Sequence, residues 1–169
     1  MTMRLKAEAA LPEDAREIAG LRNAAAEQLL AKYGKGDWSS SVSTKGVLSD
    51  MRTGKVFVIR RRQRIVATLS LSTSKPWAID VSYFTASQHP LYVTHMAVAT
   101  EWQRQGVGRH CMKEVERLAR AWPARVVRLD AYDCPAGAGP FYAICGYREV
   151  GRVIYRQTPL VYYELVLGE

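Results

Sequence analysis

The stretch from Leu91 to Trp122 constrains this chain most. The apolar run LYVTHMAV leads through ATEW into the polar loop Gln103–Arg109, after which apolar residues recur at helical spacing. This pattern predicts a strand, a glycine-containing loop and an amphipathic helix. The first N–H groups of such a helix have no partner within it and lie at the positive end of its dipole. Because glycine lets the backbone come close to a ligand, we expect the loop to bind phosphate.

The loop differs from the commoner nucleotide-binding loops. Gly106 and Gly108 are followed by Arg109 and His110, where a P-loop has Lys and then Ser or Thr, and no third glycine completes a dinucleotide fingerprint. The sequence therefore disfavours a nucleotide triphosphatase and a dehydrogenase.

Two motifs in the expected order carry a family resemblance. The spacing Gln-x-x-Gly-x-Gly, after a strand ending in Ala97-Val98, resembles the coenzyme A loop of the GNAT superfamily of acyl-CoA-dependent N-acyltransferases. A predicted strand over Val126–Asp130 and the segment FYAICGY at 141–147 follow, and this segment resembles the family's Phe-Tyr-x-x-x-Gly-Phe/Tyr element. The chain is identified as a member of this superfamily.

The predicted architecture is α/β, with one domain over residues 1–169. At 169 residues and 48% apolar content the chain is long enough to bury a core. The patterns predict strands at 4–9, 56–59, 65–69, 91–98, 126–130, 149–155 and 160–167. They predict helices from Pro12, at 43–52 and from Gly106. We expect a mixed central sheet flanked by helices. The resemblance implies that strands 91–98 and 126–130 splay apart and hold the thioester between them.

Charge and cysteine content limit the partners. The net charge of +8 suits nucleic acid, a membrane surface or an anionic ligand, and coenzyme A itself carries several phosphate charges. The tightest basic cluster, Arg60–Arg64, falls in a predicted turn, where a solvated surface is favoured over an acidic or nucleic-acid partner. Three cysteines without metal-ligand spacing indicate a reducing compartment. We expect a cytoplasmic protein with no metal, membrane span or secretory signal.

The resemblance implies acetyl-CoA as the acyl donor and assigns residues to it. Backbone groups of Met96, Ala97 and Val98 would lie along the cofactor, with a strand N–H near Val98 polarising the thioester carbonyl. The side chains of these residues leave open the alternative that they are only core strand. The remaining cofactor-binding candidates are Gln103, Arg104, Gln105, Gly106, Val107, Gly108, Arg109 and Tyr142. Of these, Arg104 and Arg109 flank the glycines and suit phosphate oxygens, although a basic rim occurs at many helix starts.

Tyr142 is the candidate general acid. The departing thiolate needs a proton, and a phenol stays protonated at neutral pH. The family places a tyrosine here, while the alternative is a core aromatic beside Phe141 and Tyr147.

His95 is the first candidate for the general base, which an ammonium acceptor needs before it attacks. Strand alternation places His95 opposite Thr94 and Met96 unless a bulge intervenes, so a packed or surface histidine remains an alternative. Lesser candidates are Asp80, Glu101, Asp130 and Asp133.

One position departs from the family. Cys134 stands eight residues before Tyr142, where an asparagine often contacts the cofactor, and a thiol hydrogen-bonds much more weakly than an amide. The long segment Ser72–Pro90, rich in aromatics, is a candidate lid over the acceptor, with Trp77, Asp80 and Tyr83 able to receive a cation.

Two functions from different classes follow. The first is an N-acetyltransferase acting on a primary amine of a small molecule or protein by direct attack in a ternary complex. The alternative is a basic binding module of the same fold that recognises nucleic acid or a protein partner without turnover. The intact loop and Tyr142 favour the enzyme, and we expect no nucleic-acid partner. A homodimer remains possible, because the apolar strand 161–167 would pair well if it lay at a sheet edge.

Overall fold

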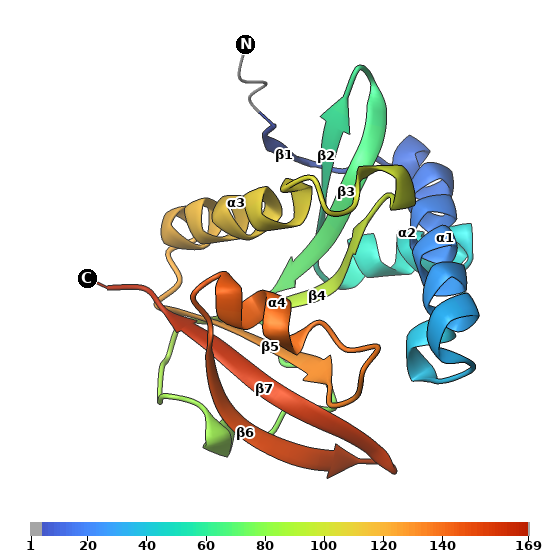
Figure 1. The fold of residues 1–169 in the computed structure, drawn as a ribbon. Helices are drawn as coiled ribbons and strands as arrows, with labels where there is room; N and C mark the ends of the chain where they lie inside the picture. Colours follow the sequence, from blue (N-terminus) through green and yellow to red (C-terminus); the bar gives the residue numbers. More distant parts are fainter. Residues whose placement is uncertain (1–4, 169) are drawn as a thin grey trace. The chain divides into compact units, whose positions relative to one another are not determined.

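The computed structural model describes residues 5–168, which form two compact units (Figure 1). The first unit comprises the chain up to Ser72 together with Thr94–Val115, and the second comprises Thr73–Val93 and the chain from Glu116 onward. Within the described residues, no helix is both long and apolar enough to cross a membrane.

The first unit begins with a short strand and two helices. Its elements are β1 (Ala7–Ala9), a 3₁₀ turn (Pro12–Asp14), α1 (Ala15–Tyr33), α2 (Thr44–Thr53), β2 (Lys55–Arg61) and β3 (Arg64–Ser72). The predicted helix at 43–52 is confirmed as α2, with Ser43 as its N-cap, because the Ser43 side chain accepts the N–H of Gly46. Gly34 and Gly54 follow the last residues of α1 and α2. The predicted strand at 4–9 is shorter than expected, and Arg4 lies outside the described residues.

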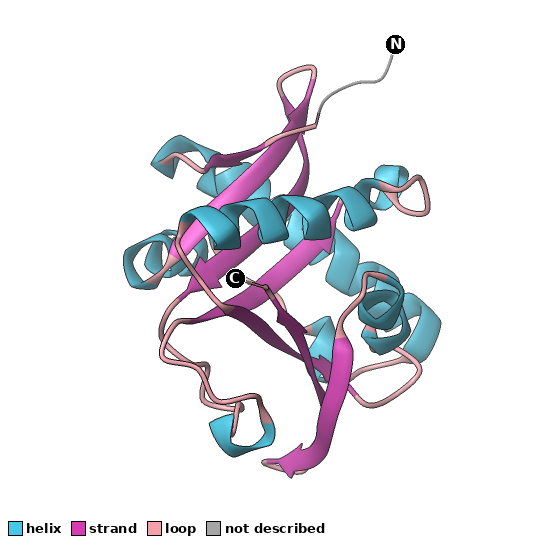
Figure 2. Cartoon of the chain, turned by 90° about the vertical axis from the view of Figure 1, so that its left-hand side faces the viewer, coloured by secondary structure: helices cyan, strands magenta, loops and turns pink. Residues whose placement is uncertain are grey.

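The predicted hairpin is also confirmed. β2 and β3 pair antiparallel, with Phe57 opposite Leu69, and their turn stands at the top of Figures 1 and 2. Arg62 and Gln63 turn the chain with φ of 50° and 70°, as a tight hairpin turn requires. Arg60 is not a solvated turn residue, because its Nη2 lies 2.6 Å from the Asp14 carboxylate.

An apolar core joins the helices to the hairpin within the first unit. Ile18 of α1, Val47 of α2 and Val58 of β2 are at most 1% exposed and belong to one buried cluster. Because α1 and α2 share this core, they lie side by side and hold their polar faces at fixed positions.

The second unit consists mainly of a strand ladder. Its elements are β5 (Val126–Tyr132), α4 (Gly139–Ile144), β6 (Arg148–Tyr155) and β7 (Thr158–Val166). β7 pairs antiparallel with both β5 and β6. The expectation that the last strand offers an edge for dimerisation was therefore wrong: β7 is internal, because β6 folds back along it and takes the outer position.

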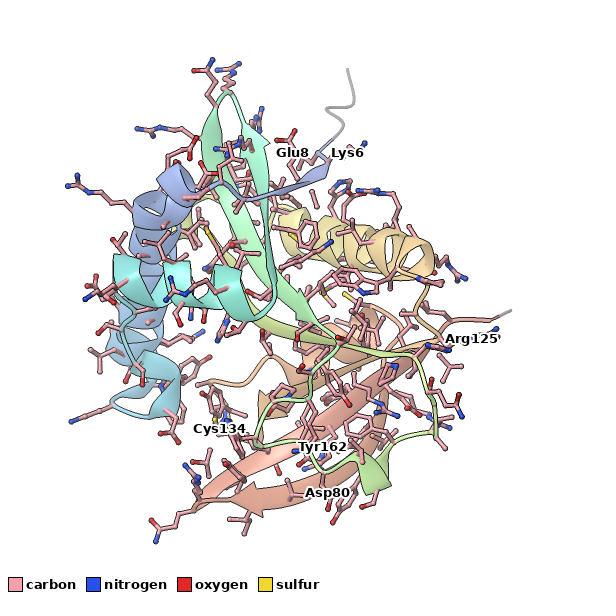
Figure 3. All side chains as sticks on the ribbon, turned by 180° about the vertical axis from the view of Figure 1, so that it is seen from behind. Lys6, Glu8, Asp80, Arg125, Cys134 and Tyr162 are labelled. Carbon is pink, nitrogen blue, oxygen red and sulfur yellow. The ribbon has the colours of Figure 1, made fainter. Side chains whose placement is uncertain are left out.

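The segment at 73–90 is anchored in the second unit. It contains a 3₁₀ turn at Val81–Tyr83, and Phe84 is buried against the Tyr162 ring. Asp80 and Tyr162 approach each other in Figure 3, where the Asp80 N–H donates to the Tyr162 hydroxyl at 3.1 Å.

Two elements have residues in both units. β4 (Pro90–Val98) pairs in parallel with β5 from Pro90 to Tyr92, and α3 (Val107–Ala121) follows it along the chain. The strand order is β1-β2-β3-β4-β5-β7-β6. This mixed sheet of seven strands, flanked by helices, confirms the predicted α/β class.

Candidate active site

The loop between β4 and α3 belongs to the first unit. Gly106 has a φ of 84°, a left-handed conformation in which glycine is favoured, and Arg104 also has a positive φ of 59°. α3 begins at Val107, and no backbone acceptor among residues 5–168 takes the N–H groups of Val107, Gly108 or Arg109. These amides stand at the positive end of a helix 15 residues long, so an anion can bind there.

The glutamines of the loop fold back on its own backbone. Gln103 Nε2 donates to the Val98 carbonyl at 3.1 Å, and Gln105 Nε2 donates to the Glu101 carbonyl at 2.9 Å. The first bond ties the loop to the end of β4, and the second lies within the segment between β4 and α3. Arg104 and Arg109 are exposed on either side of the glycines.

Met96, Ala97 and Val98 are the last three residues of β4, and all three are partly buried. Ala97 packs against the apolar core of the first unit. Directly beyond them, the Ala99 N–H donates to the Val66 carbonyl of β3 at 2.8 Å. The end of β4 is therefore held in place on its β3 side.

His95 lies within β4 but departs from the regular strand conformation. Its φ is 54°, which is uncommon for a residue other than glycine, and regular strand alternation does not apply there. The side chain is 41% exposed, and its Nδ1 lies 3.6 Å from Oδ2 of Asp50 in α2. The same Oδ2 accepts a hydrogen bond of 3.0 Å from Arg22 Nη1 in α1. Sequence reasoning missed Arg22 and Asp50, because both look like ordinary polar residues of surface helices.

The charge state of His95 follows from these neighbours. Burial of the ring and the positive charge of Arg22 lower the pKa of His95 from its usual value, although the Asp50 carboxylate opposes them. The imidazole is therefore neutral at neutral pH and has a free lone pair that can accept a proton.

A cavity of about 720 Å³ lies elsewhere in the first unit. It is lined by α1, the hairpin turn and the residues after β4, including Arg61, Arg62 and Trp102. The Arg61 guanidinium lies 4.3 Å from the centre of the Trp102 ring, so this part of the basic cluster packs against an aromatic face.

Tyr142 belongs to the second unit. It sits in α4 with a side chain that is 9% exposed, and its ring lies 5.3 Å from Phe141, 6.1 Å from Tyr147 and 6.2 Å from Tyr163. Burial, together with neighbours that include Tyr142, raises the pKa of Tyr147. Burial thus favours the protonated form of the Tyr147 phenol.

Two glycines before Tyr142 allow close backbone packing. A Cβ at Gly137 would lie 1.8 Å from the Tyr132 carbonyl oxygen, and one at Gly139 would lie 2.6 Å from the Tyr163 hydroxyl. The α4 turn can therefore sit tightly on the strands only because both positions lack a side chain.

The lesser base candidates have other surroundings. Asp80 accepts the N–H and hydroxyl of Ser82, and these hydrogen bonds lower its pKa. Asp133 pairs with Arg152 at 3.2 Å. Burial raises the pKa of Asp130. Among residues 5–168, no group of His, Cys, Asp and Glu side chains is arranged to hold a metal ion.

The fold and the loop define a class of α/β proteins that have an anion-binding loop at the start of a helix. Residues 22–147 match the acetyltransferase (GNAT) family, and the chain belongs to this family. It is therefore an acyl-CoA-dependent acetyltransferase. A search of curated protein sequences found no match.

Solved structures agree with the family at the level of the fold. A putative acetyltransferase from Salmonella typhimurium, solved with its cofactor acetyl-CoA, is 16% identical over 98% of this chain and 95% of its own, with a TM-score of 0.70. The ribosomal-protein-S18-alanine N-acetyltransferase from Escherichia coli is 13% identical over 98% and 96%, with a TM-score of 0.72. A putative phosphinothricin N-acetyltransferase is 14% identical over 98% and 100%, with a TM-score of 0.73.

Proposed function

We propose that this protein transfers an acetyl group from acetyl-CoA to a primary amine by direct attack in a ternary complex. The observation that carries the proposal is the loop after β4, where, among residues 5–168, no backbone acceptor takes the N–H groups of Val107, Gly108 and Arg109 beside Gly106. These groups suit the pyrophosphate of coenzyme A. Arg104 and Arg109 add positive charge at the two ends of the loop.

The acyl group would react near the end of β4. A backbone N–H near Val98 polarises the thioester carbonyl and stabilises the oxyanion that forms when the amine nitrogen attacks the carbonyl carbon. The backbone of Met96 and Ala97 aligns the cofactor. Because a thioester is already activated, positioning supplies much of the rate enhancement.

Two protons must move. The acceptor attacks as the free amine, after its ammonium form has lost a proton to water. His95, neutral at neutral pH, takes the second proton, which the nitrogen loses as the carbon–nitrogen bond forms. Tyr142 donates its hydroxyl proton to the thiolate as the carbon–sulfur bond breaks. The products are an amide and free coenzyme A, and the phenol regains its proton from solvent.

The acceptor is the less defined half of the reaction. The names of the solved neighbours include an acetyltransferase of a ribosomal protein alanine and one of phosphinothricin, so both protein and small-molecule amines are acceptor classes to test. We propose the cytoplasm as the compartment, in keeping with free thiols at Cys111, Cys134 and Cys145.

The test is release of coenzyme A thiol from acetyl-CoA in the presence of peptides and small primary amines. Each acceptor is paired with its N-acetylated form, which has no free amine. Release that depends on the free amine would support the proposal. A protein that binds acetyl-CoA but acetylates no amine in the panel would favour the binding-module alternative.

A further inference from the structure

We propose that Asp50 and Arg22 are positioning residues, which orient the His95 imidazole so that its Nε2 accepts the proton of the acceptor amine. This inference rests on the proposed function and deepens it. It assigns to the polar faces of α1 and α2 a task in catalysis that the sequence does not reveal.

The first observation is the backbone at His95. A φ of 54° in mid-strand is a conformation that a residue with a Cβ seldom adopts, and such conformations persist where the surroundings enforce them. The departure from the pleat places the imidazole against Asp50 of α2, and 41% of the side chain remains exposed. His95 is thus held on one side and accessible on the other.

The second observation is the order of contacts across three elements. Arg22 Nη1 lies 3.0 Å from Asp50 Oδ2, and the same oxygen lies 3.6 Å from His95 Nδ1. The side chains of Arg22 and Asp50 are 18% and 25% exposed, so the pair is largely shielded from solvent. The distance to His95 is longer than a hydrogen bond, as is common for catalytic contacts without substrate.

The contact determines which nitrogen can act as the base. A carboxylate oxygen beside Nδ1 favours the tautomer with its proton on that nitrogen. The lone pair then resides on Nε2, and the imidazolium formed when Nε2 takes the amine proton is stabilised by Asp50. Arg22 fixes the carboxylate and limits this stabilisation, so the ring can release its proton to water after turnover.

Charged groups act on His95 in opposite directions. Within the described part of the first unit these are Arg22 from α1, which lowers the pKa of His95, and Asp50 from α2, which raises it. Removing either charge must therefore shift the titration of His95, and the two shifts must have opposite signs. If His95 were not the base, the acidic limb of kcat/KM would not follow these shifts.

The experiment compares Asp50→Asn, Arg22→Gln and His95→Gln with the wild type. The control is Glu27→Gln, which removes an exposed carboxylate from the same helix as Arg22. Two readouts are used: the pH dependence of kcat/KM with an acceptor from the amine panel, and NMR titration of the histidine rings. There are 3 histidines in the chain, and His95→Gln assigns the relevant signal.

We expect Asp50→Asn to move the His95 titration and the acidic limb of kcat/KM to lower pH, and Arg22→Gln to move both to higher pH. In Asp50→Asn, kcat falls on the order of tenfold, and in His95→Gln on the order of a hundredfold or more. Glu27→Gln behaves as the wild type. Calorimetry gives the same acetyl-CoA affinity for all variants, because none of these side chains belongs to the loop after β4.

The inference is overturned if both charge variants shift the His95 titration in the same direction, or if His95→Gln keeps wild-type kcat. Should Arg22→Gln fail to fold, Arg22→Lys replaces it. Because lysine keeps the charge, the acidic limb of kcat/KM for Arg22→Lys must stay near its wild-type position. If the wild type does not bind acetyl-CoA, the proposed function is refuted instead. The NMR titration would still test the contacts of His95.

Discussion

Replacing Glu164 by glutamine should destabilise the protein far more than the same change at Glu149. The Glu164 side chain in β7 is fully buried, and its Oε1 accepts the Thr85 hydroxyl at 2.6 Å and Arg148 Nη2 at 2.7 Å. Its Oε2 accepts the Thr85 N–H at 3.0 Å. Glutamine keeps the shape but turns an NH₂ group toward one set of these donors. Lost charge-assisted bonds and an unsatisfied buried donor cost about 2–4 kcal/mol.

Glu149 is the matched control, because it also pairs with an arginine. Its Oε1 lies 2.6 Å from Arg152 Nε, but the side chain is 42% exposed, and water replaces the lost contact. In urea unfolding followed by circular dichroism at pH 7, Glu164→Gln lowers the midpoint at unchanged slope, and Glu149→Gln leaves it where it is. Equal midpoints for Glu164→Gln and wild type would refute the reasoning.

The effect should also depend on pH. Burial raises the pKa of Glu164, but the hydrogen bonds from Thr85 and Arg148 outweigh it and lower the pKa below its usual value. The unfolded chain therefore binds the proton more readily, so the stabilisation is present above the ordinary glutamate pKa and is lost as pH falls through the folded value. The difference between wild type and Glu164→Gln should shrink in acid, and a growing difference would contradict this account.

Three further predictions concern other sites. Gly137→Ala should lower the stability of the fold by about 2 kcal/mol or more, because the new Cβ meets the Tyr132 backbone. Gly20→Ala in α1, where a Cβ has nothing within 4 Å, should raise the stability by up to about 1 kcal/mol. Thermal melts compare the two variants. Tyr142→Phe should lower kcat on the order of a hundredfold, and unaltered turnover would remove the phenol from the mechanism. Cys111 is buried, and burial raises the pKa of its thiol to about 12. It should therefore resist iodoacetamide at pH 8 in the folded protein and react in urea, which mass spectrometry of the labelled peptide can establish.

The sequence predicted the elements well where local chemistry decides them. The helix predicted at 43–52 and the apolar face of α3, where Cys111, Val115 and Ala119 are fully buried, follow from residue preferences and helical period. The segment at 78–84 was less predictable, because its aromatic residues suit a strand but pack as a turn against Tyr162.

Strand order and the surroundings of His95 were beyond sequence reasoning. Nothing in strand 160–167 shows that it pairs on both sides, since an apolar strand fits an edge or an interior position equally well. The alternation rule assumes a regular pleat, and no glycine or turn motif in the sequence marks the positive φ of His95 within an apolar strand. The contact with Asp50 joins residues 45 positions apart, so only the packing of α2 against the strand reveals it.

The most direct test of the central claim is calorimetric titration with acetyl-CoA, comparing wild type with Gly108→Trp. The indole would occupy the first turn of α3, beside the N–H groups proposed to hold the pyrophosphate. We predict saturable one-to-one binding by the wild type and none by the variant, whose fold is verified by circular dichroism. No binding by the wild type, or equal binding by a folded Gly108→Trp protein, would contradict the proposed cofactor site.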